Sequence, residues 1–476
     1  MMPSPHSRGF ISSLSIARSI SGCLLILCFS CAFADHTDDK PGIPVSDESS
    51  TSGIAESISD PSNTNEKASL HGQFTNVYQW HDSFKAPYTG ANSLTPQRTH
   101  AQTNDLTLYA GIRLWQGGEL YINPEIDEGF GLSNTLGLAG FASGEAYKVG
   151  KAYPYLRFQR LFFRQVINLD GEQYQVESAA NQLAGSRSSN NIVFTAGKLS
   201  VVDIFDTNSY AHDPRSDFLN WSILDAGAFD YAADSWGYTY GAAAEWNQSR
   251  WTLRGGLFDL SKIPNNEHLE KDFRQYSLIG ELEERHDWLG HPGKFKLLVF
   301  DNRGYMANYS DAVKLGLETS TTPDVALVRH FNSRKGLVIN LEQAFNPNIG
   351  MFARASINDG SKEAFEFTDI NKSVEAGLSI RGGIWNRPND TVGIAGVING
   401  ISDKARTYFA SGGLGILIGD GQLVHYGTER ILEAYYSTQI CPNARISLDY
   451  QHVDNPSYNQ DRGPVSIIGF RFHAEL

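Results

Sequence analysis

Hydrophobic and polar residues alternate without a break over the last nine residues of the chain. The apolar positions are Ile468, Phe470, Phe472, Ala474 and Leu476, and between them lie Gly469, Arg471, His473 and Glu475. Successive side chains of a strand point to opposite faces, so this segment predicts a strand with one apolar and one polar face. An open strand edge at a terminus invites aggregation, whereas a closed transmembrane barrel pairs its last strand with its first. The pattern therefore favours a barrel that the C-terminal strand closes.

The same alternation recurs from Ser69 to the end of the chain. In residues 106–115 the apolar set is Leu106, Leu108, Ala110, Ile112 and Leu114, and the facing set is Thr107, Tyr109, Gly111, Arg113 and Trp115. A Gln-Gly-Gly turn at 116–118 supplies the positive φ of a tight hairpin. The return strand has Leu120, Ile122 and Ile126 on one face, and Tyr121, Asn123, Glu125 and Asp127 on the other. We expect the polar faces, with Arg113, Tyr121, Glu125 and Asp127, to line a pore.

Later segments repeat the pattern, and charge falls on the non-lipid face each time. Glu433, between Leu432 and Ala434, is a further candidate for the pore wall. A soluble β-sandwich would alternate similarly, but over about 400 residues it should break into domains, and no linker follows residue 68. The 408 residues from Ser69, at roughly 20–28 residues per strand and connection, predict about 14–20 strands and an even number. The predicted fold is an all-β, antiparallel transmembrane barrel, too wide for its own side chains to fill.

Three arginines occur within residues 155–164. Arg160 and Arg164 share a face with Phe162, opposite Leu161 and Phe163. An arginine facing lipid near mid-membrane would cost about 2–4 kcal/mol, so we place both in the lumen. Guanidinium groups beside aromatic rings suit sugars, whose hydroxyls accept hydrogen bonds and whose C–H faces pack on rings. The alternative interpretation is a ladder of salt bridges that braces the wall.

Clean alternation is lost between residues 198 and 240, where short polar and aromatic residues are mixed. This stretch predicts either a loop or helical turn folded into the lumen, or a well-packed extracellular loop. The sequence favours neither. Arg215, within it, is a further pore-lining candidate.

The N-terminus has the features of a secretory signal. Arg8 and Arg18 are followed by a mostly apolar stretch, and Ala32-Phe33-Ala34 is a small-x-small cleavage site. We therefore expect a signal peptide over residues 1–34, without lipidation at Cys23, because the hydrophobic region follows that cysteine. Residues 35–68 contain eight acids, two lysines and no aromatic residue. They predict an acidic, disordered periplasmic extension.

Charge and missing motifs exclude several classes of function. Without Arg8 and Arg18 the chain has 37 basic and 53 acidic residues, a net charge of −16, which argues against nucleic acid as a partner. The mature chain keeps only Cys441, so it forms no internal disulfide or cysteine metal site. Gly-x-Ser-x-Gly, His-Glu-x-x-His and phosphate-binding-loop motifs do not occur. We therefore predict no enzymatic activity, no cofactor and no resident metal.

Eight stretches carry a family resemblance. They are residues 70–75, 83–88, 92–94, 123–132 (Asn-Pro-Glu-Ile-Asp-Glu-Gly-Phe-Gly-Leu), 143–147, 210–215, 217–221 and 227–231. Together they resemble the carbohydrate-selective porin family of the OprB type. The resemblance implies a 16-stranded barrel in the outer membrane of a Gram-negative bacterium, surrounded by lipid. It also implies that sugars diffuse through a constriction of arginines, acids and aromatics. Assembly as a monomer or a trimer stays open.

The resemblance leaves two alternatives for the solute. The chain is also similar to a branch linked to manganese uptake, and it lacks the Gly-Asp-Trp-Gly segment with which glucose-selective members begin their barrel. A divalent cation such as Mn²⁺, or small solutes in general, are therefore alternatives to sugars. The acid excess and the group Glu125, Asp127 and Glu128 favour the cation, since hard cations take oxygen ligands.

Overall fold

The computed structural model describes residues 65–476. The predicted signal peptide, 1–34, and all but the last four residues of the predicted extension, 35–68, lie outside the described residues. Within residues 65–476, the helices fall short of the length and hydrophobicity that a membrane-spanning helix requires.

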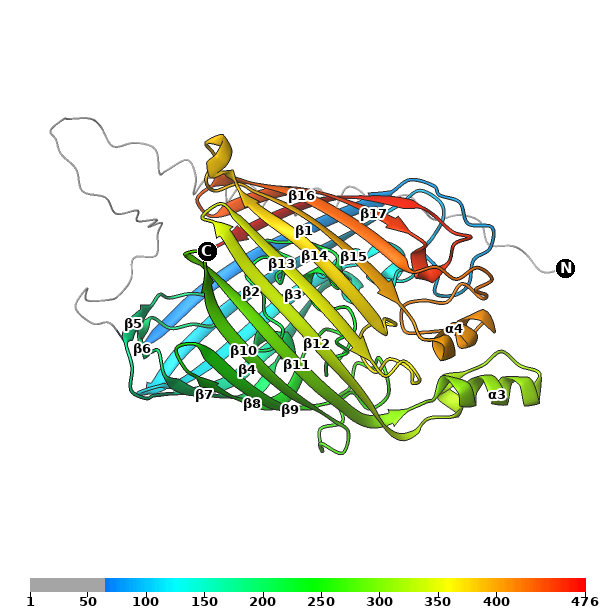
Figure 1. The fold of residues 1–476 in the computed structure, drawn as a ribbon, viewed down its shortest axis with the longest axis horizontal. Coiled ribbons are helices and arrows are strands. Elements are labelled where there is room, and N and C mark those ends of the chain that lie inside the picture. Colours follow the sequence, from blue (N-terminus) through cyan, green and yellow to red (C-terminus); the bar gives the residue numbers. More distant parts are fainter. Residues whose placement is uncertain (1–64) are drawn as a thin grey trace. The chain divides into compact units, whose positions relative to one another are not determined.

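Sixteen antiparallel strands form a closed barrel in the described part of the chain, which confirms the predicted fold class (Figure 1). Sequential strands are neighbours, except that β4 pairs with β7 and a separate two-stranded sheet, β5–β6, lies between them in the sequence. The barrel strands are β1 (Ala68–His81), β2 (Thr99–Trp115), β3 (Gly118–Gly129), β4 (Lys151–Asn168), β7 (Asn191–Leu199), β8 (Thr239–Asn247), β9 (Trp251–Asp259), β10 (Tyr276–Trp288), β11 (His291–Met306), β12 (His330–Asn346), β13 (Ile349–Asn358), β14 (Lys372–Arg381), β15 (Thr391–Gly400), β16 (Glu429–Cys441), β17 (Ala444–Asp454) and β18 (Val465–Glu475).

The last strand closes the barrel against the first, as the C-terminal alternation predicted. Phe74 of β1 lies opposite Ala474 of β18, and the register continues to His81 and Ile467. The ring centroids of Phe74 and Phe472 are 6.2 Å apart on the apolar face. No strand edge of the barrel is left unpaired, which is the condition for a sheet to sit in lipid.

The outward and inward faces also follow the alternation. Leu106, Leu108 and Ile112 are exposed on the outside, whereas Thr107 and Tyr109 between them are buried. Trp115 is a correction: it was expected on the inner face, but it is 57% exposed and packs 5.5 Å from Phe163. The β2–β3 register shifts between Arg113 and Trp115, and such a bulge re-aims the side chain at the strand end.

The two ends of the barrel differ in the length of their connections. One end, the turn end, has short links such as 116–117, 289–290 and 442–443, and it also holds β5 (Gln173–Val176) and β6 (Gly185–Ser188). The other, the loop end, has long connections with α3 (Tyr309–Thr319), α4 (Asp403–Ala410), η1 (Leu132–Asn134), η3 (Val325–Leu327) and η5 (Pro456–Tyr458). η4 (Gly382–Trp385) lies in a link of the turn end. Short turns face the periplasm in outer-membrane barrels.

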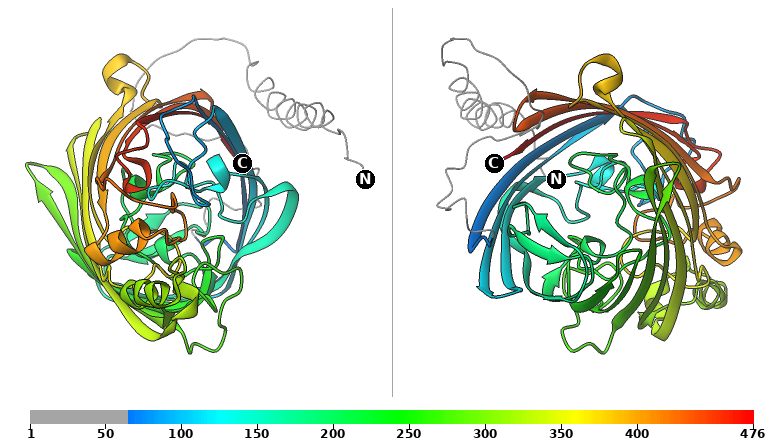
Figure 2. Two further views of the ribbon diagram at one scale, coloured as in Figure 1. Left: turned by 90° about the vertical axis from the view of Figure 1, so that its right-hand side faces the viewer. Right: turned by 60° about the vertical axis from the view of Figure 1, so that its left-hand side comes forward.

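Residues 200–238, here called the inward segment, enter the barrel. Of the two predicted alternatives, a segment folded into the lumen and an extracellular loop, the structure shows the first. Figure 2 shows this part of the chain, in cyan to green, inside the ring of strands. It contains η2 (Val201–Asp203) and α2 (Trp221–Leu224), and Phe205, Phe218 and Ala228 are fully buried. Its core continues into loop residues such as Phe365 and Tyr408.

Carboxylates of the wall hold the inward segment by its backbone. Glu433 of β16 accepts hydrogen bonds from the amides of Leu219 and Asn220. Arg334 of β12 pairs with Asp230, whose carboxylate also accepts from the amides of 365–367. Irregular backbone inside a barrel carries amides without ladder partners, and charged inward side chains satisfy them here.

Candidate functional site

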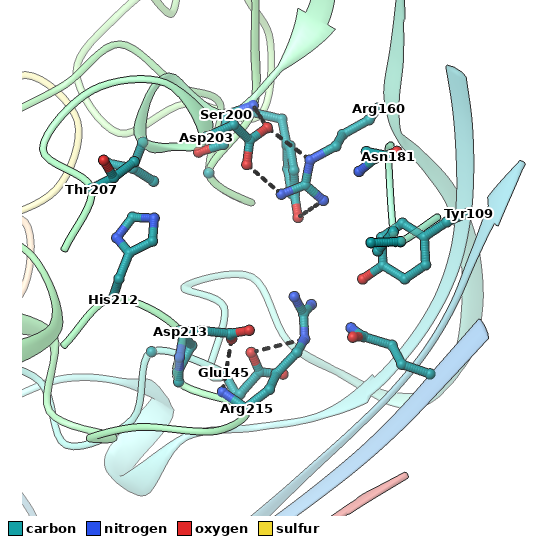
Figure 3. Close-up of a pocket in the computed structure, with 18 of the residues that line it drawn as sticks. Tyr109, Glu145, Arg160, Asn181, Ser200, Asp203, Thr207, His212, Asp213 and Arg215 are labelled. Atoms are coloured by element: carbon teal, nitrogen blue, oxygen red, sulfur yellow. Dashed lines mark hydrogen bonds and ion pairs between the residues drawn. The ribbon is translucent and has the colours of Figure 1, made fainter. Parts of the chain in front are cut away.

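A cavity of about 850 Å³ lies between the inward segment and the wall formed by β1, β2 and β4. Its lining combines Tyr109 and Arg160 from the wall, residues 178–182 from the tip of the β5–β6 hairpin, and much of the inward segment. Figure 3 shows the labelled side chains arranged around an open centre.

Arg160 and Asp203 form one side of this ring. Nε and Nη2 of Arg160 lie 2.8 and 2.6 Å from the two Asp203 oxygens, a two-pronged pair. Asp203 ends η2 and accepts a hydrogen bond from the Ser200 amide at 3.0 Å, as part of a capping box. The Arg160 guanidinium also lies 5.0 Å from the Tyr238 ring centroid. The local turn chemistry of 200–203 therefore sets where the arginine is held.

Arg215 lies on the opposite side (Figure 3). Its guanidinium is 3.4 Å from Glu145, 3.6 Å from Glu125 and 3.8 Å from Asp105. Its own amide donates to Asp213 at 2.9 Å. Both arginine side chains are largely buried, 12% exposed for Arg160 and 13% for Arg215, so their partners hold them in one orientation.

His212 occupies a third side, facing Tyr109 across the ring in Figure 3. Its Nδ1 is 3.2 Å from an oxygen of the buried Asp225. Burial lowers the pKa of His212, but the hydrogen bond and the charge of Asp225 outweigh burial, so the pKa lies above 6.5. The imidazole is thus a titratable positive charge at the cavity.

Aromatic rings complete the lining. Trp221 is stacked between Phe141 and Phe367, with centroid distances of 5.1 and 5.0 Å. The guanidinium carbon of Arg157 lies 3.4 Å from the ring centroid of Trp236 and covers one face of that ring. Trp221, Trp236 and Tyr231 line the cavity. Both faces of Trp221 and one face of Trp236 are covered by these neighbours, so the cavity offers mainly apolar ring edges beside charged donors and acceptors.

The structure separates the sequence-predicted residues into two groups. Arg160, Arg164 and Arg215 line the cavity. Glu125 and Asp127 point inward but are at most 1% exposed, and they do not line it. Glu125 is covered because it accepts from Thr107, Tyr147 and Gln159 and lies beside Arg215. Glu125 thus supports Arg215 from behind, and Asp127 accepts from Gln159 beside it at 3.3 Å.

Arg113, Tyr121 and Glu433, also predicted for the pore wall, contact inward-folded backbone, and none of the three is among the residues that line this cavity. Arg113 donates to the carbonyl oxygen of Ala184 and pairs with Glu119 at 3.2 Å. The Tyr121 hydroxyl accepts from the Leu183 amide at 3.1 Å. Glu433 holds the inward segment, as described above.

Four lining residues were missed by residue-level prediction: Glu145, Asp203, His212 and Asp213. All four lie in stretches between strands, where the strand period gives no orientation. Two features of the sequence could have pointed to these residues. They are the loss of alternation in residues 198–240 and the stretch 143–147, which carries part of the family resemblance.

A second cavity, of about 540 Å³, adjoins the first toward the turn end. Arg164, Gln182, Asp203 and Thr207 line both cavities, so these four residues lie at the boundary between the two. Within residues 65–476, no three His, Cys, Asp or Glu side chains are grouped so as to hold a metal ion.

Comparison with known proteins agrees with the fold and the motifs. A family model described as "Carbohydrate-selective porin, OprB family" matches residues 91–476. OprB of Pseudomonas putida, in its high-pH structure, is similar with a TM-score of 0.65 and 13% identity over 86% of this chain and 94% of that one. The outer membrane channel DcaP of Acinetobacter baumannii gives 0.48 and 9% over 87% and 99%. A comparison with curated proteins gave no match. At 13% identity the Pseudomonas putida structure establishes the fold alone.

Proposed function

This chain belongs to the OprB family of carbohydrate-selective porins, and we propose that sugars cross it between the Arg160–Asp203 and Arg215–Glu145 pairs. The protein is an outer-membrane porin of a Gram-negative bacterium. The observation that carries the proposal is the position of these two ion pairs on opposite sides of one cavity (Figure 3).

Paired charges suit a neutral, hydroxyl-rich solute. A guanidinium donates a hydrogen bond to a hydroxyl oxygen, and a carboxylate accepts one from a hydroxyl hydrogen. Each ion pair can therefore satisfy a sugar hydroxyl both as acceptor and as donor. Because the acids offset both arginines, neither sign of ion is strongly concentrated at the ring. The pairs therefore favour recognition of hydroxyls over selection by charge.

Aromatic ring edges add the second half of sugar recognition. The rings of Trp221, Trp236 and Tyr231 border the same cavity. A sugar ring has apolar C–H groups, and these contact the ring edges while its hydroxyls reach the ion pairs. A passing sugar would exchange water for these contacts without a covalent step.

The buried position of Glu125 and Asp127 weakens the cation alternative. Both acids are covered by protein groups, so a cation in the cavity would not contact them. Hard cations bind through directly contacting oxygens or through a shared water. The recording described next distinguishes sugar passage from passage of Mn²⁺ and from general diffusion of small solutes.

The test is single-channel recording in KCl with glucose as the probe. Glucose should block the parent channel, and Arg160→Ala should raise the half-blocking concentration by roughly tenfold, the equivalent of one charge-assisted hydrogen bond. Arg98→Ala is the matched control, because Arg98 and Asp82 form an exposed Arg–Asp pair 3.5 Å apart outside the cavity. Block by MnCl₂ but not by glucose would favour the cation, and block by neither would favour general diffusion.

A further inference from the structure

The β5–β6 hairpin bounds the cavity from the turn end. Its tip, residues 177–184, connects the two short strands, and residues 178–182 line the cavity. Ala179 and Gln182 exchange both backbone hydrogen bonds, at 3.0 and 2.9 Å, so the tip is a tight turn. Asn181 takes the left-handed φ of 55° that this turn requires and that asparagine tolerates. The tip is thus a defined structure at the exit from the cavity.

Leu183 and Asn181 are two of the residues that attach the tip to the barrel wall. Leu183 is 1% exposed and packs with Tyr121 and Phe162. The Asn181 side chain accepts from Asn123 at 2.8 Å, and its carbonyl oxygen accepts from Arg164 at 2.8 Å. Arg164, a cavity-lining residue, therefore depends on the position of the tip.

A third attachment comes from Glu66, two residues before β1. Its carboxylate accepts from the Ala184 amide at 2.8 Å and from the Ser178 hydroxyl at 3.1 Å. Its own amide donates to the Ala184 carbonyl oxygen at 3.1 Å. Its carbonyl oxygen accepts from Arg113 at 2.9 Å. One residue thus joins both ends of the tip, at 178 and 184, to the start of the barrel.

We infer that Glu66 is a positioning residue that sets the width of the turn-side mouth of the pore. It does so by closing residues 178–184 against the wall, which places Asn181 and Arg164 at the exit. The inference concerns the width of the mouth and does not depend on which solute passes.

Removal of the carboxylate should release the tip. The Ala184 amide would lose its acceptor, while Ser178 would keep only its contact with His71 at 3.1 Å. The variant loses both hydrogen bonds to the carboxylate, and loss of even one such bond to a charged group shifts an open–closed ratio by roughly ten- to a hundredfold. The tip would then open far more often, and the mouth would widen.

The experiment combines hydrogen exchange and conductance on the folded, full-length barrel. In Glu66→Ala, exchange of the Leu183 and Ala184 amides should accelerate by roughly ten- to a hundredfold, and single-channel conductance in KCl should rise. Glu66→Gln keeps one acceptor oxygen and should lie near the parent in both measurements. Glu177→Ala is the matched control, because it removes an exposed acid from the same tip and should change neither measurement.

A second variant guards against loss of folding in the first. Leu183→Ala removes the apolar anchor of the same tip and should raise both exchange and conductance. If Glu66→Ala matches Glu177→Ala in both measurements, the inference is wrong. Faster exchange with unchanged conductance would overturn it as well, because the tip would then not set the mouth. Neither readout uses a sugar, so failure here is distinct from failure of the proposed function.

Discussion

Glu433→Ala tests how the inward segment is held in the lumen. Glu433 is fully buried, and its two oxygens accept the amides of Leu219 and Asn220. Each hydrogen bond to a charged acceptor is worth about 1.5–3 kcal/mol, so the pair contributes about 3–6 kcal/mol. Glu433 is buried beside Asp449, and relief of the desolvation cost of this buried carboxyl reduces the net loss to about 2–4 kcal/mol.

The assay is hydrogen exchange of the two amides in the folded barrel. A loss of about 2–4 kcal/mol in local opening free energy corresponds to exchange roughly 30- to 700-fold faster. The control is Ser437→Ala on the same strand and inner face, since the buried Ser437 hydroxyl makes no hydrogen bond among the described residues. Exchange in Glu433→Ala within about threefold of the control, a difference below about 1 kcal/mol, would show that Glu433 does not hold the inward segment.

Three further predictions concern charge, ring contact and closure. Because the pKa of His212 lies above 6.5, its pair with Asp225 stabilises the inward segment fully below pH 6.5, and this contribution is lost as the pH rises through the raised pKa. Lowering the pH through the same window should reduce cation preference, as reversal potentials in a KCl gradient would report, and His212→Asn should remove that step. Trp221→Leu should raise the half-blocking glucose concentration by about two- to tenfold, the equivalent of lost apolar contact with the ring edge, and an unchanged value would exclude a contact between glucose and this ring. Deletion of residues 472–476 removes half of the β1–β18 register and should prevent assembly, as loss of the heat-modifiable band on gels would show; a normal band would contradict closure by β18.

The alternation of the strands predicted the barrel well, because lipid and lumen impose opposite polarity on successive residues. The final strand and the 106–127 hairpin both lie as their pattern indicated. The predicted inward orientation of Trp115 is wrong because a bulge at the strand end breaks the period on which the prediction depends. Local pattern is therefore reliable only where the ladder is regular.

The site was predicted less completely, because its geometry depends on contacts between distant parts of the chain. Arg160 and Arg164 could be placed in the lumen from the cost of facing lipid. The alternation of the strand shows only that Glu125 points inward. It does not show that Tyr147 and Arg215 cover this side chain, because Arg215 lies far from it in the sequence. The partner of Arg160, Asp203, comes from a turn without strand period. An inward segment and an outer loop have similar composition, so the sequence alone left both open.

A crystal structure of the barrel, grown with glucose above its half-blocking concentration, would show directly whether sugars pass between the two ion pairs. We expect the sugar between Arg160 and Arg215, with hydroxyl oxygens about 2.7–3.2 Å from guanidinium nitrogens and C–H groups against an aromatic ring edge. Glucose bound elsewhere in the lumen, with this cavity holding only water, would contradict passage between the two ion pairs.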